Sequence, residues 1–121
     1  MKFIRFLSED KKILYGAYNP DKSSVARVIT GDIFGNYNIT GQEEKITKLL
    51  APLLPVNILA LGINYKKHGD ETAINYPEQP LLFLKATTGV VGHHDPIALP
   101  TAGHDCVDYE AELAIIIGRR A

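Results

Sequence analysis

The feature that most constrains the fold is an apolar run close to the end of the sequence, Leu113 to Ile117, which only Gly118 to Ala121 follow. Such a run is typical of a buried β-strand, and a buried strand needs neighbours that pair with its backbone and cover its faces. The residues after Ile117 are too few to supply either. We therefore expect that the sequence is a fragment of a longer protein or that another chain completes the fold.

Composition places the chain among soluble globular proteins. Its 121 residues suffice for one domain, or for one small domain and part of another. With 45% hydrophobic residues and a formal net charge of -1, it has no electrostatic attraction to nucleic acid or to an anionic membrane. No apolar stretch approaches the roughly 18 residues of a membrane span. The single Cys106 and a start without a signal peptide favour a cytoplasmic location.

The first part of the chain predicts a small antiparallel sheet, because polar and apolar residues alternate over three segments that turn-forming residues separate. These segments are 2–7, 12–18 and 25–30. Glu43 to Leu50 has the clearest helical spacing of apolar residues and predicts a helix. Pro52 and Pro55 end that segment, so we place a module boundary near residue 55.

The second part predicts further strands around one loop. Asn57 to Gly62 suits a buried strand, which leads into a loop that begins at Asn64, and the polar segment Lys66 to Glu78 has room for one helical turn. Three more extended segments follow: Leu81–Lys85, Pro96–Pro100 and Leu113–Ile117. The expected fold class is α+β and predominantly β, with a small antiparallel β domain over 1–55 and an incomplete domain over 56–121.

Glu110 and Glu112 lie two residues apart, directly before the last apolar run. In an extended strand successive side chains alternate faces, so the two carboxylates would lie side by side. Carboxylates that close repel each other, and a hard cation such as Mg²⁺ between them removes the repulsion. The pair therefore predicts two ligands of a metal site, and the alternative is a solvated strand face.

His68 lies in the segment after a predicted buried strand, where loops project functional groups from a rigid scaffold. In a helical turn Glu71 would lie three residues further along and could hydrogen-bond the imidazole. Such a carboxylate fixes the ring tautomer and raises its basicity, which suits a general base; the alternative is an exposed surface histidine. Lys85 follows four apolar residues, where it could neutralise a substrate carboxylate or extend its ammonium into solvent.

Four motifs, taken in order, resemble the start of the catalytic domain of the fumarylacetoacetate hydrolase family. They are Ala60–Tyr65 with His68 and Glu71, Pro80–Lys85, Asp95–Pro100, and Val107–Leu113 with Gly118. The range 1–55 also resembles the small β-rich N-terminal domain that many bacterial members carry. The resemblance implies that the second domain is the first part of a mixed β-sandwich or β-roll.

The resemblance also implies a function. It assigns His68 and Glu71 to catalysis, Asn64, Tyr65 and Lys85 to substrate binding, and Glu110 and Glu112 to a divalent cation. The cation is Mg²⁺, with Mn²⁺ or Ca²⁺ as alternatives, and a later aspartate completes the site. Members of this branch hydrolyse, decarboxylate or isomerise small β-diketo and 2-oxo acids or 2-hydroxy-dienedioates through an enolate, and they are commonly homodimers.

Two expectations about activity follow. The third metal ligand and a downstream substrate-binding lysine would lie beyond Ala121, so we expect the isolated 121-residue chain to be inactive. The alternative to an enzyme is a non-catalytic interaction or assembly module, in which another chain completes the fold by pairing with the apolar strands.

Overall fold

The computed structural model describes residues 1–72 and 75–120 of the chain. Its contacts divide the chain into two compact units, Met1–Pro52 with Val91–Ala121, and Leu53–Val90. The described residues form seven strands, one α-helix and three short 3₁₀ helices, and every strand pairing is antiparallel. The prediction of an α+β fold that is predominantly β is confirmed.

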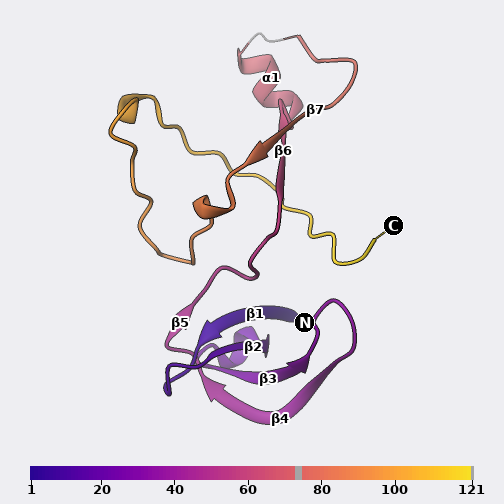
Figure 1. Cartoon of the computed structure of the whole chain (residues 1–121), viewed down its shortest axis with the longest axis vertical. Helices are drawn as coiled ribbons and strands as arrows, with labels where there is room; N and C mark the ends of the chain where they lie inside the picture. The colour runs from indigo at the N-terminus through magenta and orange to yellow at the C-terminus, as the bar shows by residue number, and fades with distance from the viewer. Residues whose placement is uncertain (73–74, 121) are drawn as a thin grey trace. The chain divides into compact units, whose positions relative to one another are not determined.

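The N-terminal residues form a five-stranded sheet in the order β4-β3-β2-β1-β5. Its strands are β1 (Lys2–Leu7), β2 (Ile13–Tyr18), β3 (Val25–Gly31), β4 (Tyr37–Lys45) and β5 (Lys48–Leu49), and the 3₁₀ helix η1 (Pro20–Lys22) precedes β3. The three strands predicted from alternation are therefore present as β1, β2 and β3. The rings of Phe3 on β1 and Tyr37 on β4 meet edge to face at 5.1 Å although two strands separate them, so the sheet is strongly curled, as Figure 1 shows.

The core of this sheet is small and tightly packed. Phe6 is completely buried, and Ala26 is only 2% exposed. A Cβ atom at Gly16 would lie 2.7 Å from the Ala26 Cβ and 2.8 Å from the Phe6 Cε1, closer than carbon atoms pack. The absence of a side chain at position 16 therefore lets the Phe6 ring lie against the middle of the sheet.

The helix predicted over Glu43 to Leu50 is wrong. The backbone of Glu43 to Lys45 pairs with β3 as the end of β4, and Lys48–Leu49 pairs with β1 as β5. Local apolar spacing favoured a helix, but pairing with strands distant in sequence satisfies the same backbone groups and prevails over local propensity.

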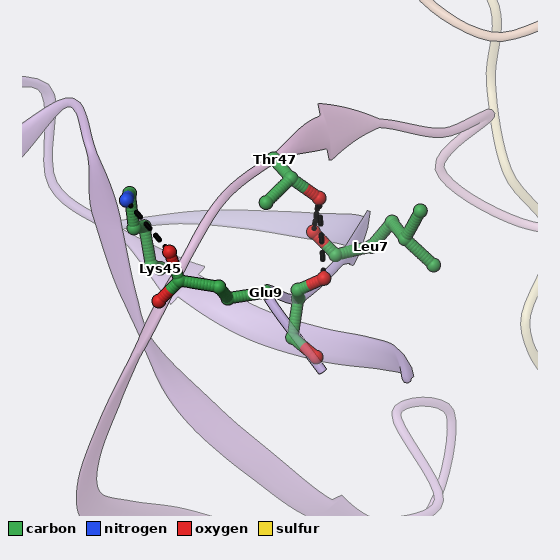
Figure 2. A network of polar contacts seen from close by, with 5 residues as sticks. Leu7, Glu9, Lys45 and Thr47 are labelled. Carbon is green, nitrogen blue, oxygen red and sulfur yellow. Dashed lines mark hydrogen bonds and ion pairs between the residues drawn. The ribbon is translucent and has the colours of Figure 1, made fainter. Parts of the chain in front are cut away.

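A network of polar contacts joins the β1–β2 turn to the segment between β4 and β5 (Figure 2). The Thr47 hydroxyl donates to the carbonyl of Leu7 at 2.8 Å, and the Thr47 amide donates to the same oxygen at 2.9 Å. Lys45 pairs with Glu9 at 2.9 Å, and this hydrogen bond and charge raise the pKa of the Lys45 ammonium. The contacts hold β5 at the edge of the sheet.

The unit Leu53–Val90 consists of a two-stranded sheet and one helix. Strand β6 (Ile58–Gly62) pairs with β7 (Leu81–Lys85), and α1 (Lys66–Thr72) and η2 (Thr87–Gly89) complete the unit. Both strands and the helical turn were predicted; positions 73–74 of the predicted Lys66–Glu78 segment lie outside the described residues. The prediction that β6 is buried is wrong, because β6 alternates between half-buried and exposed residues, as is usual in a sheet covered on one face at most.

The segment from Val91 to Arg120 contains the 3₁₀ helix η3 (His104–Cys106) and, in its described residues, no strand. The strands predicted at Pro96–Pro100 and Leu113–Ile117 are therefore wrong for this chain. A strand needs neighbouring strands for its backbone groups, and neither run is among the strands of the two sheets that the described residues form. Ile115 and Ile117 are both 79% exposed.

Candidate functional site

The loop after β6 begins with a strained residue. Ile63 has a φ of 55°, in the left-handed region that β-branched residues rarely adopt. Such a conformation costs about 1–3 kcal/mol and persists only where surrounding contacts enforce it, which is most often at a functional site. Asn64 and Tyr65, the residues predicted to bind substrate, follow directly and lead into α1.

Helix α1 carries His68 and Glu71, the predicted catalytic pair. Their spacing of three residues places both on one side of the helix, and both are exposed. The structure describes both side chains and gives no hydrogen bond between them. The backbone carbonyl of His68 instead accepts a hydrogen bond from the Thr72 hydroxyl at 2.9 Å. The pair is thus available to a ligand on the open side of a short helix.

The other side of α1 is covered by Tyr76. Its hydroxyl lies 2.7 Å from the carbonyl oxygen of Lys66 and 2.5 Å from an Asp70 carboxylate oxygen. The hydrogen bond to Asp70 raises the pKa of the Tyr76 hydroxyl, because ionisation would place two negative charges in contact. The ring lies against Gly69, the buried residue of the helix.

Lys85 ends β7, as predicted, and its side chain is exposed. Its ammonium lies 5.3 Å from the centroid of the Phe83 ring, which is two residues away on the same face of the strand. The contact leaves the ammonium accessible, so Lys85 can bind an anionic group within the unit that also carries His68.

Glu110 and Glu112 lie in an exposed segment without regular secondary structure. The argument that a strand places both carboxylates on one face therefore has no support in this structure. Carboxylate oxygens are the type of ligand that a hard cation prefers, but two carboxylates supply only part of the ligands that such a cation needs. Among the described residues there is no group of three or more histidine, cysteine, aspartate or glutamate side chains that could hold a metal ion.

The predicted site residues belong to two different units of the chain. Asn64, Tyr65, His68, Glu71 and Lys85 belong to the unit Leu53–Val90, and Glu110 and Glu112 belong to the other unit. Sequence reasoning missed Ile63, Gly69 and Tyr76 as residues that shape the first set. The one available signal was a glycine in the middle of a predicted helical turn, which usually marks a close approach by another group.

Family comparisons identify both parts of the chain. Residues 57–121 match the model described as fumarylacetoacetate (FAA) hydrolase C-terminal, and residues 1–52 match the Rv2993c-like N-terminal model. The chain belongs to the fumarylacetoacetate hydrolase family. The family predicted from the four motifs is therefore confirmed.

Several curated relatives match most of the chain. It is 41% identical over 100 residues to an uncharacterised protein of Archaeoglobus fulgidus, covering 74% of this chain and 40% of that protein. It is 37% identical over 106 residues to protein Rv2993c of Mycobacterium tuberculosis, covering 86% and 40%. A mitochondrial oxaloacetate tautomerase of Xenopus laevis is 41% identical over 73 residues, covering 60% and 23%. The chain thus spans 23% to 40% of the length of these relatives.

Solved structures show the same fold. The 5-carboxymethyl-2-hydroxymuconate delta-isomerase from Mycobacterium smegmatis has a TM-score of 0.68 and 33% identity, covering 84% of this chain and 39% of the isomerase. The 2-hydroxyhepta-2,4-diene-1,7-dioate isomerase from Mycobacterium marinum has a TM-score of 0.52 and 28% identity, covering 75% and 34%. Within the described residues no helix is long and apolar enough to cross a membrane.

Proposed function

We propose that this chain contributes the general base and two metal ligands to an enzyme that acts on small 2-oxo or β-diketo acids through an enolate. The observation that carries the proposal is the exposed pair of His68 and Glu71 on α1, a helix that begins three residues after the strained Ile63. Family membership supports it, and so do similar proteins named as an oxaloacetate tautomerase and as isomerases of hydroxymuconate and heptadienedioate.

The common stage of these reactions is an enolate, which a tautomerase forms by removing a proton from the carbon next to a carbonyl group. A neutral His68 imidazole accepts that proton, and the electrons of the broken C–H bond move into the C–C bond of the enolate. When the imidazolium returns this proton to the enolate oxygen, the product is the enol. The reaction is therefore an isomerisation and needs no second reactant. Glu71 stabilises the imidazolium while it carries the proton.

The remaining site residues bind and orient the substrate. The accessible Lys85 ammonium pairs with a substrate carboxylate. Asn64 and Tyr65 contribute polar groups from the loop between β6 and α1. Glu110 and Glu112, with further oxygen ligands from outside these residues, would hold Mg²⁺, or else Mn²⁺ or Ca²⁺, whose positive charge favours the enolate when it is bound.

The metal assignment is tested by Mg²⁺ titration of oxaloacetate tautomerisation in the complete protein, with Glu110→Gln and Glu112→Gln variants. We expect the Mg²⁺ concentration for half-maximal rate to rise by at least about tenfold, since even changes outside the ligand shell weaken metal binding by that factor. Glu78→Gln, at another exposed carboxylate, is the matched control and should leave the titration unchanged. Equal Mg²⁺ dependence in all variants would remove the two glutamates from the proposal.

A second candidate is a non-catalytic assembly module, which is favoured by one observation: all five residues of β7 are exposed, and four of them are large and apolar. A complete protein with no turnover of oxaloacetate or acylpyruvates, but with a stable complex through β7, would support this class. The homodimer that the family resemblance implies is also a proposal, and sedimentation of the complete protein tests it.

A further inference from the structure

Helix α1 is too short to be stable by itself. It has seven residues, whereas isolated helices shorter than about 12–15 residues are marginal in water. Its fifth residue, Asp70, and its first, Lys66, lie on one side, and a rotation of about 100° per residue places His68 and Glu71 on the opposite side. The side with Lys66 and Asp70 must therefore be held by another part of the chain if His68 and Glu71 are to keep a fixed orientation.

Tyr76 contacts the helix on that first side in two ways. Its hydroxyl bonds to the Lys66 carbonyl and to the Asp70 carboxylate, one turn apart. Its ring meets the helix at Gly69, where an added Cβ would lie 2.6 Å from the Tyr76 Cε1 and 3.1 Å from the Ile63 Cγ2. The Tyr76 ring therefore packs against the buried Gly69, and the side chain of the strained Ile63 lies next to the same position.

We propose that Tyr76 is a positioning residue, whose ring and hydroxyl fix α1 so that His68 and Glu71 keep the orientation needed for proton transfer. The proposal rests on the proposed function, in which these two residues form the base. The contact made by Tyr76 leaves the side of the helix that carries the base uncovered, so the tyrosine orients the base without blocking a substrate.

The contact between Tyr76 and α1 depends on the protonation state of the Tyr76 hydroxyl. The hydroxyl carries one hydrogen and faces two oxygen acceptors, so the Lys66 carbonyl and the Asp70 carboxylate share it. Ionisation of Tyr76 removes that hydrogen and sets a phenolate against the carboxylate. The contact therefore holds at neutral pH and is lost at alkaline pH, when Tyr76 ionises.

The test uses the complete protein and the variants Tyr76→Phe and Gly69→Ala. The first keeps the ring and removes the hydroxyl. The second adds a methyl group where the ring sits, although alanine favours helix by about 1 kcal/mol over glycine. Tyr37→Phe is the matched control, because the structure gives the Tyr37 hydroxyl no hydrogen bond to any described residue. Amide hydrogen exchange at Gly69, whose N–H donates to the Tyr65 carbonyl at 3.1 Å, reports on the helix without any substrate.

We expect Tyr76→Phe to accelerate exchange at Gly69, and to lower kcat for oxaloacetate tautomerisation by about three- to tenfold, the value of one hydrogen bond, with little change in KM. Gly69→Ala should also lower kcat, which a role in helix stability alone would not produce. Unchanged exchange in Tyr76→Phe, or faster exchange with unchanged kcat, would overturn the proposal. If exchange changes as expected but His68→Asn keeps full activity, the proposed base fails while the contact of Tyr76 with α1 stands.

Discussion

A methyl group at position 16 tests the packing of the N-terminal sheet. In Gly16→Ala the new Cβ would lie 2.7 Å from the Ala26 Cβ and 2.8 Å from the Phe6 Cε1, and the Phe6 side chain is fully buried. Overpacking of this kind costs about 1–3 kcal/mol. Replacing glycine also restricts the unfolded chain, which stabilises the fold by about 0.4–1 kcal/mol. The expected net loss of unfolding free energy therefore lies between about 0 and 2.6 kcal/mol, with a centre near 1.3 kcal/mol.

Gly41→Ala on β4 is the matched control, because nothing lies within 4 Å of its added Cβ. At this position the alanine acts only by restricting the unfolded chain, so we expect the free energy of unfolding to increase by about 0.4–1 kcal/mol. Urea unfolding of both variants, followed by circular dichroism, separates them: with a slope of about 2 kcal/mol per molar, the Gly16→Ala midpoint should fall by roughly 0.7 M. A Gly16→Ala protein as stable as Gly41→Ala would refute the packing described for Phe6.

Two further predictions concern the edges of the same unit. Thr47→Val keeps the shape of the side chain but removes the hydroxyl that donates to the Leu7 carbonyl at 2.8 Å, and we expect it to lower the unfolding free energy by about 0.5–1.5 kcal/mol in urea titrations. Asp95 accepts hydrogen bonds from Lys48 and from the Gly92 amide, which lower its pKa. Its stabilising contribution is therefore present above the ordinary value of 3.8 and is lost as the pH falls through the lower folded pKa. Lys48→Met should reduce this loss in acid unfolding curves, and identical acid curves would contradict the assignment.

The sequence predicted the strands that carry a clear apolar pattern of their own. Alternating residues gave β1, β2 and β3, and apolar runs that end in glycine or lysine gave β6 and β7. The error at Glu43–Leu50 arose because the backbone pairs with β3 residues 16 to 20 positions away and with β1 residues 41 to 43 positions away, and local apolar spacing does not reveal such pairing. The apolar run at Leu113–Ile117 belongs to neither of the two sheets formed by the described residues, so a strand predicted from its composition does not form.

The candidate site was predictable to a similar extent. The order of motifs pointed to His68 and Glu71, and the structure places both on one exposed side of α1. The contribution of Tyr76 was not predictable, because it depends on the ring reaching across to Gly69, and an exposed tyrosine before a proline carries no such signal in the sequence. The metal ligands Glu110 and Glu112 remain a prediction from residue chemistry and family resemblance.

The most direct test of the central claim is the rate of oxaloacetate enol–keto conversion by the complete protein with His68→Asn. A general base contributes about 10²–10⁴-fold to such a step, so the account predicts a fall in kcat of that size. Lys67→Gln, at the neighbouring exposed position of α1, should keep the rate of the unchanged protein. A His68→Asn protein as active as Lys67→Gln would contradict the account, because the proton would then be accepted by a residue elsewhere.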